Sequence, residues 1–212
     1  MKAILFDFDG VVVKSMEIHY DGWRKVLQEY GIEMSPEELY VLEGQGLEEV
    51  ASELIRKFNL PSNERQKIIE KKEYFYNQNE SAALYPNLIE TMNWAKEKEL
   101  KIALVTGSHF ERVDEVLCNF GIETYFDVLV TSNDVYQTKP SPEPFLRAAN
   151  LLEIDPTDCV VIENSPLGIR SAKSAEMRCI AITTTLPPMF LKEADVVADN
   201  FIEVLESLKK LY

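Results

Sequence analysis

The chain has 212 residues, of which 46% are hydrophobic and 27% are charged, as in ordinary folded proteins. Its formal net charge of -14 argues against nucleic acid or an anionic membrane as the main partner. No apolar run approaches the roughly 20 residues that span a bilayer, and no basic leader precedes the first strand-like run. We therefore expect a cytoplasmic protein, and we take a monomer as the starting expectation.

Short apolar runs recur along the chain and predict buried strands. Because hydrophobic and polar residues do not alternate within them, they are typical of a parallel sheet that is covered on both faces. Helical patterns lie between most of the runs, which indicates an α/β fold with right-handed crossovers. The predicted strands are Ile4–Phe8, Ile102–Val105, Val128–Val130, Val160–Ile162, Ile180–Ile182 and, more weakly, Val196–Val197.

The interval from residue 15 to residue 81 breaks this alternation, because it contains helical stripes and no convincing strand. Within it, Ser35-Pro36-Glu37-Glu38 has the spacing of a helix capping box. We therefore predict a Rossmann-like, parallel-sheet core formed by residues 1–14 and 82–212. Residues 15–81 are predicted to form an all-helical cap domain inserted after the first strand.

Polar residues gather where the predicted strands end. Because ligands of doubly wound sheets bind beyond the carboxyl ends of the strands, we expect these residues to share one cleft. They are Asp7 and Asp9 after the first strand, Thr106, Gly107 and Ser108 after the second, Lys139 after the third, and Glu163 and Asn164 after the fourth.

Each of these groups also has a simpler interpretation. Asp7 and Asp9 can be ordinary polar residues at a strand end, and Thr106-Gly107-Ser108 can be a turn with a helix cap. Lys139 can be a solvated surface lysine, and Glu163 an acidic residue at a helix N-terminus. All of these interpretations would have to hold together, in register with four strand ends, to explain the set.

The set as a whole fits phosphoryl transfer. A carboxylate such as Asp7 can attack phosphorus and form an aspartyl-phosphate. A second carboxyl group two residues later, Asp9, would lie on the same side of a strand, where it can protonate the leaving oxygen and then activate water. A hard divalent cation would neutralise the carboxylates, while Lys139 and the Thr106 hydroxyl would hold the remaining phosphoryl oxygens.

Four segments, "DFDGV", "LVTGS", "KPSPEPF" and "VIENSPLGIRSAKSA", resemble in order and spacing the four motifs of haloacid dehalogenase-like hydrolases. The nearest branch has a helical cap after the first strand and contains beta-phosphoglucomutase and many sugar-phosphate phosphatases. The resemblance implies Asp7 as nucleophile, Asp9 as general acid and base, and a phosphate site formed by Thr106, Gly107, Ser108 and Lys139. It further implies Mg²⁺ held by Asp7, by the backbone carbonyl of Asp9, and by Glu163 or Asn164.

The chain departs from this family pattern at three positions. Lys14 replaces a frequent acidic residue, Asn87 replaces a usual glycine, and Asn164 gives Glu-Asn in place of Glu-Asp. Two histidines remain open to interpretation. His109 is either a polar residue at a helix start or a substrate contact, and His19 is either a packed hinge residue or part of the site.

The leading hypothesis is therefore a Mg²⁺-dependent phosphatase of a small phosphorylated metabolite, a sugar or polyol phosphate. A phosphosugar mutase is the first alternative, although Glu43 and Leu47 stand near Gly44 where beta-phosphoglucomutases carry basic residues. A dehalogenase is disfavoured because those family members lack an aspartate at the position of Asp9. A non-catalytic binding protein on the same scaffold is the remaining alternative.

Overall fold

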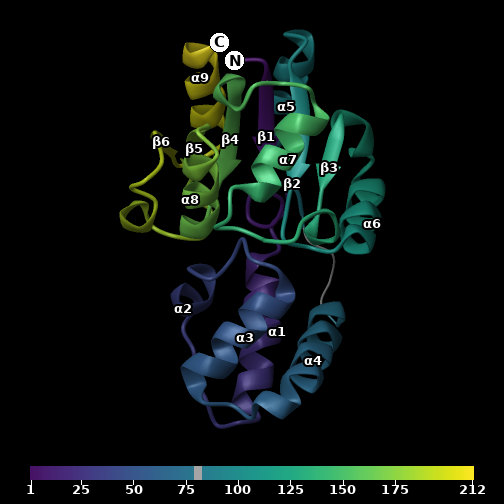
Figure 1. The fold of residues 1–212 in the computed structure, drawn as a ribbon, viewed down its shortest axis with the longest axis vertical. Coiled ribbons are helices and arrows are strands. Elements are labelled where there is room, and N and C mark those ends of the chain that lie inside the picture. The colour runs from purple at the N-terminus through teal and green to yellow at the C-terminus, as the bar shows by residue number, and fades with distance from the viewer. Residues whose placement is uncertain (79–82) are drawn as a thin grey trace.

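The computed structural model describes residues 1–78 and 83–212, and its core is a six-stranded parallel sheet (Figure 1). The strand order is β3-β2-β1-β4-β5-β6. The predicted parallel-sheet α/β core is therefore confirmed, and β1 lies at the centre, where the strand order reverses and such sheets bind ligands. The strands are β1 (Ala3–Phe6), β2 (Lys101–Val105), β3 (Val128–Val130), β4 (Cys159–Glu163), β5 (Arg178–Ile182) and β6 (Val196–Ala198).

Helices cover both faces of the sheet. Helices α5 (Leu88–Glu97), α6 (Phe110–Phe120) and α9 (Phe201–Leu211) pack on the face that contains Ile4 and Phe6. Helices α7 (Glu143–Leu151) and α8 (Pro166–Ser174) pack on the opposite face, which contains Leu5 and Val161. Both faces are thus shielded from water, which explains why the strands are apolar without alternation. Among the described residues, no helix is both long enough and apolar enough to cross a bilayer.

In the described part of the chain between β1 and α5, four α-helices gather beyond the carboxyl ends of the strands (Figure 1). They are α1 (Met16–Gln28), α2 (Pro36–Tyr40), α3 (Leu47–Phe58) and α4 (Arg65–Asn77), and we call residues 16–77 the helical segment. The predicted capping box is confirmed, because the Ser35 hydroxyl accepts from the Glu38 backbone and the Glu38 carboxylate accepts from the Ser35 backbone. The predicted division between residues 81 and 82 lies outside the described residues, so the domain boundaries stay a prediction.

The first strand is shorter than predicted, because it ends at Phe6 instead of Phe8. The Asp7 backbone still donates to the Ile162 carbonyl at 3.0 Å, but the Phe8 carbonyl then accepts from the three N–H groups of residues 11–13. This tight turn passes through Gly10 at φ 86°, a conformation that favours glycine. The expectation that strand alternation aligns Asp7 with Asp9 is therefore wrong, since the turn sets the position of Asp9.

Asn87, which replaces a usual glycine, adopts a left-handed conformation at φ 62° immediately before α5. Asparagine tolerates this conformation better than most residues other than glycine, so the substitution keeps the turn. The other departure nearby, Lys14, places its ammonium 5.4 Å from the centre of the Tyr85 ring.

Candidate active site

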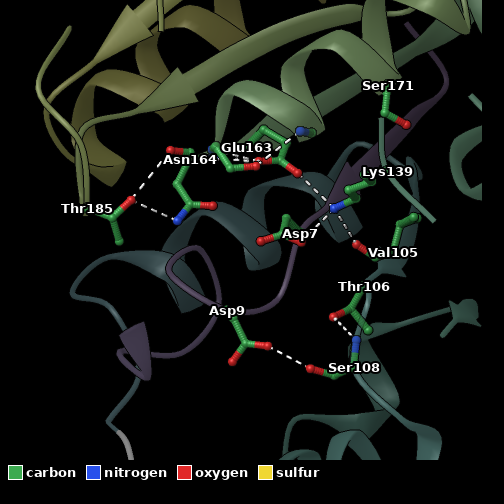
Figure 2. A network of polar contacts seen from close by, with 12 residues as sticks. Asp7, Asp9, Val105, Thr106, Ser108, Lys139, Glu163, Asn164, Ser171 and Thr185 are labelled. Atoms are coloured by element: carbon green, nitrogen blue, oxygen red, sulfur yellow. Dashed lines mark hydrogen bonds and ion pairs between the residues drawn. The ribbon is translucent and has the colours of Figure 1, made fainter. Parts of the chain in front are cut away.

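Lys139 is the centre of a buried ion network at the carboxyl ends of the central strands (Figure 2). Its Nζ donates to Asp7 Oδ1 at 2.6 Å, to Glu163 Oε1 at 2.7 Å and to the Val105 carbonyl at 3.0 Å. The lysine side chain is only 1% exposed, which excludes the interpretation as a surface residue. Burial opposes its charge, but the attraction of Asp7 and Glu163 is stronger and raises the pKa of Lys139.

Asp7 lines a cavity of about 220 Å³ while one of its oxygens is held by Lys139. Burial raises the pKa of Asp7 to about 8, the negative charges of Glu163 and Asp9 add to this effect, and Lys139 opposes it. Here two carboxylates, Asp7 and Glu163, share one ammonium. A further cation beside Asp7 would therefore stabilise its ionised form.

Glu163 has its acceptor oxygens engaged inside the protein. While Oε1 accepts from Lys139, Oε2 accepts from the backbone N–H of Asn164 at 2.8 Å, and from the backbone and hydroxyl of Ser165 at 2.9 and 3.0 Å. Gly168 leaves room for this carboxylate, since a Cβ there would lie 1.6 Å from Oε1. This geometry favours a role for Glu163 in orienting Lys139.

Asn164 presents its side-chain oxygen toward Asp7 (Figure 2). Its Nδ2 donates to the Thr185 hydroxyl at 3.0 Å, which fixes the orientation of the amide. Gly10 permits this arrangement, because a Cβ at residue 10 would lie 2.1 Å from the same nitrogen. The amide oxygen and the Asp7 carboxylate are both hard donors of the kind that Mg²⁺ prefers.

No cluster of three or more His, Cys, Asp or Glu residues is arranged to hold a metal within residues 1–78 and 83–212. A cation beside Asp7 would therefore have few protein ligands, namely a carboxylate, an amide oxygen and the predicted backbone carbonyl of Asp9. Such a mixed oxygen set fits Mg²⁺, which usually keeps several water ligands and binds through one or two carboxylates.

Asp9 accepts hydrogen bonds on both of its carboxylate oxygens. Oδ1 accepts from Ser15 at 2.5 Å, from Arg112 Nη2 at 2.5 Å and from His19 Nε2 at 3.2 Å. Oδ2 accepts from Ser108 at 2.8 Å and from Arg112 Nη1 at 2.9 Å. Burial alone would raise the pKa of Asp9, but Arg112 and His19 outweigh it and hold the pKa well below its usual range. Asp9 is thus a carboxylate in this arrangement.

Arg112 is the main residue of this site that sequence reasoning missed. Its guanidinium donates to Asp9, to the Ser108 hydroxyl at 2.7 Å, and to the Tyr76 hydroxyl at 2.7 and 3.1 Å, so each of its five N–H groups has an acceptor. Because Tyr76 lies on α4 and Arg112 on α6, this residue links the helical segment to the core. The sequence feature that could have identified Arg112 is its position in the first turn of the helix that follows β2.

The predicted phosphate-binding loop lies beside Asp9 and also lines the cavity (Figure 2). The Thr106 hydroxyl accepts from the Ser108 backbone at 3.0 Å, and the Ser108 hydroxyl donates to Asp9. Gly107 lies directly against the helical segment, because a Cβ there would be 2.3 Å from the Gln45 carbonyl oxygen. The loop therefore needs glycine at this position for the two parts of the chain to meet.

The two histidines take different places. His19 is packed against the Tyr76 ring at 4.7 Å between ring centres and also contacts Asp9, so it is more than a packed hinge residue. Burial, with the nearby Lys72 charge, lowers the pKa of His19 to about 4. His109 precedes α6, lies 3.1 Å from the Ser132 hydroxyl through Nδ1, and lines the cavity.

Comparison of the sequence with known protein families agrees with the geometry of this site. The family model for haloacid dehalogenase-like hydrolases matches residues 4–182. The chain belongs to this family. The predicted resemblance is therefore confirmed, and with it the expectation of an enzyme of the phosphatase type.

Relatives of this haloacid dehalogenase-like chain include both phosphatases and a phosphomutase. It is 32% identical to a phosphorylated carbohydrates phosphatase of Thermotoga maritima, over 82% of each chain. It is 27% identical to validoxylamine A 7'-phosphate phosphatase of Streptomyces hygroscopicus subsp. limoneus, covering 96% of this chain and 95% of that protein. A solved beta-phosphoglucomutase from Clostridium difficile superimposes with a TM-score of 0.87 at 26% identity, over 99% of this chain and 96% of the other.

We expect Arg112→Ala to lower the free energy of unfolding by about 3 kcal/mol, because it leaves the Asp9 carboxylate buried without its main counter-charge. Arg170→Ala is the matched control. Arg170 pairs with Glu193 at the surface, where both side chains are more than half exposed, so its loss should cost about 0.5 kcal/mol. Denaturant unfolding measures both values.

The same Arg112→Ala substitution in an Asp9→Asn background should cost much less, since no carboxylate is then left unpaired. Equal losses for Arg112→Ala in the two backgrounds would contradict an energetic coupling between Arg112 and Asp9.

Proposed function

We propose that this chain is a Mg²⁺-dependent phosphatase that hydrolyses a small phosphorylated metabolite, a sugar or polyol phosphate, through an aspartyl-phosphate. The observation that carries the proposal is the buried Asp7 carboxylate, which lines the cavity, is held on one oxygen by Lys139 and lies close to Asp9. The phosphatases among the relatives support the same reaction class.

In the first half-reaction, an Asp7 oxygen forms a bond to phosphorus while the bond from phosphorus to the ester oxygen breaks. Lys139 orients Asp7 and offsets negative charge on the phosphoryl oxygens, and the Thr106 hydroxyl and the N–H groups of the loop that follows β2 hold them. Glu163 keeps the ammonium of Lys139 in place. A bound Mg²⁺ beside Asp7 and Asn164 would supply additional positive charge for the transferring phosphoryl group.

Asp9 is proposed as the general acid and base. It gives a proton to the leaving alcohol oxygen and then takes a proton from the water that attacks the aspartyl-phosphate, which releases inorganic phosphate and regenerates Asp7. Because Arg112 holds Asp9 as a carboxylate in this arrangement, Asp9 can carry its proton only after this contact loosens. Substrate enters the same cavity, and we expect its binding to loosen the contact between Arg112 and Asp9.

A phosphosugar mutase is the second candidate, because the beta-phosphoglucomutase fold is matched over nearly the whole chain. A mutase uses the same residues but must hold a second phosphate at the far end of its substrate. Near Gly44, this chain carries Glu43 and Leu47, an acidic and an apolar residue, and both line the cavity. These side chains disfavour a second phosphate, which supports the phosphatase.

Asp7→Asn should remove essentially all release of phosphate from para-nitrophenyl phosphate in the presence of Mg²⁺, because the amide cannot act as the nucleophile. Asp9→Asn should lower kcat by about 100-fold or more, the usual scale of acid–base help. Trapping of a labelled phosphoryl group on the protein, in the wild type and not in Asp7→Asn, is the direct measurement. Near-normal turnover of Asp7→Asn would refute the assignment.

With beta-glucose 1-phosphate as substrate, we expect release of inorganic phosphate to exceed formation of glucose 6-phosphate. Glu43 and Leu47 provide no positive charge to hold the phosphate of a bisphosphate intermediate. Both products can be followed in one reaction by coupled assays. A faster formation of glucose 6-phosphate would favour the mutase instead.

Asn164→Ala should weaken Mg²⁺ binding by about 10-fold or more, whereas Asn164→Asp should tighten it by adding a negative ligand. Glu163→Gln should instead mainly lower kcat, because it loosens Lys139 without removing an oxygen that faces the metal. Calorimetric titration with Mg²⁺ alone measures affinity without turnover, and activity titrations give kcat. If Glu163→Gln abolishes Mg²⁺ binding and Asn164→Ala does not, the two assignments are reversed.

A further inference from the structure

Glu43 brings an additional carboxyl group into the cavity that contains Asp7 and Asp9. In the part of the chain that the structure describes, the Glu43 carboxyl has no hydrogen-bond or ion-pair partner. By contrast, every side-chain nitrogen or oxygen there that is inaccessible to solvent has a hydrogen-bond partner. The Glu43 oxygens are therefore accessible to solvent, and Glu43 lines the cavity. Burial raises the pKa of Glu43 to about 7, and the charge of Asp9 adds to this effect, while Lys72 and Arg112 oppose it.

The cationic side chains Arg112 and Lys72 of the same cavity each already have an anionic partner. Arg112 uses all five of its N–H groups on Asp9, Ser108 and Tyr76. The Lys72 ammonium donates to Glu73 at 2.8 Å and lies 4.8 Å from the centre of the Tyr76 ring. A second anionic group of a substrate would have to share Arg112 with Asp9 and Lys72 with Glu73, whereas a hydrogen-bond donor finds an unpaired acceptor at Glu43.

The loop that carries Glu43 is fixed against the core. Gln45 donates from Nε2 to the Leu42 carbonyl at 3.1 Å, which braces the loop internally. Gly44 adopts φ 95° so close to the core that a Cβ would lie 3.0 Å from the Ser165 hydroxyl. Gly107 of the core also contacts this loop, because it lies so close to the Gln45 carbonyl that a side chain at residue 107 would not fit. The position of Glu43 is thus set in advance, so that ordering this loop costs little on binding.

We propose that Glu43 accepts hydrogen bonds from hydroxyl groups of the substrate and restricts the enzyme to polyhydroxylated phosphate monoesters. This inference rests on the proposed phosphatase function. With the phosphate at Asp7 and Lys139, the hydroxylated carbon chain extends to Glu43. A substrate without hydroxyls leaves this acceptor unpaired, and a second phosphate or a carboxylate meets its negative charge, so both are penalised.

The test compares two substrates in Glu43→Leu, Glu43→Gln and the wild type. Sorbitol 6-phosphate carries the hydroxyls that Glu43 would bind, and para-nitrophenyl phosphate carries none. Glu43→Leu should lower kcat/KM for sorbitol 6-phosphate by about 10-fold or more and change that for para-nitrophenyl phosphate by less than about 3-fold. Glu43→Gln, which keeps one acceptor oxygen, should lie between Glu43→Leu and the wild type.

Glu37→Gln is the matched control, because it removes an equal charge from an exposed position of α2 in the same helical segment. It should change neither substrate's kcat/KM. Equal losses on both substrates in the Glu43 variants, no loss on either, or a wild type that hydrolyses para-nitrophenyl phosphate but not sorbitol 6-phosphate would each overturn the role of Glu43. A wild type inactive on every phosphate monoester would instead overturn the proposed phosphatase function.

Discussion

The buried ammonium of Lys139 is the constraint on which the site depends. A lysine that is 1% exposed needs negative partners, and here they come from the ends of different strands, Asp7 after β1 and Glu163 at the end of β4. The Val105 carbonyl of β2 completes the set. One charge thus links three strand ends that are distant in sequence, and it holds the Asp7 carboxylate where Asp7 lines the cavity.

Asp7 and Asp9 are two residues apart, yet their surroundings shift their pKa values in opposite directions. Burial beside Glu163 raises the pKa of Asp7, whereas Arg112 and His19 hold that of Asp9 low. The tight turn through Gly10 separates the two environments, because it carries Asp9 away from Lys139 and toward α6. Pairs of carboxyl groups with divergent pKa values are typical of sites that perform both nucleophilic and acid–base steps.

The helical segment contributes to the site in two ways. Tyr76 of α4 accepts from Arg112, so the position of this segment is coupled to the carboxylate of Asp9. The loop between α2 and α3 presents Glu43 and fits against Gly107 of the core. The core supplies the strand-end residues that line the cavity, to which we assign the phosphate, and the helical segment supplies other lining residues such as Glu43. Reaction chemistry and substrate choice can therefore vary independently in such a fold.

The sequence by itself determined the parallel-sheet fold and the strand-end residues Asp7, Thr106, Lys139 and Glu163, because burial on both faces and strand ends leave local patterns in the chain. Only the tertiary structure decided the end of β1, the engagement of Glu163 inside the protein and the partnership of Arg112 with Asp9. Those two residues are 103 positions apart. Local periodicity reports which face of a helix is buried, but the charge that a polar side chain meets depends on how distant elements pack, and no short stretch of sequence carries that information.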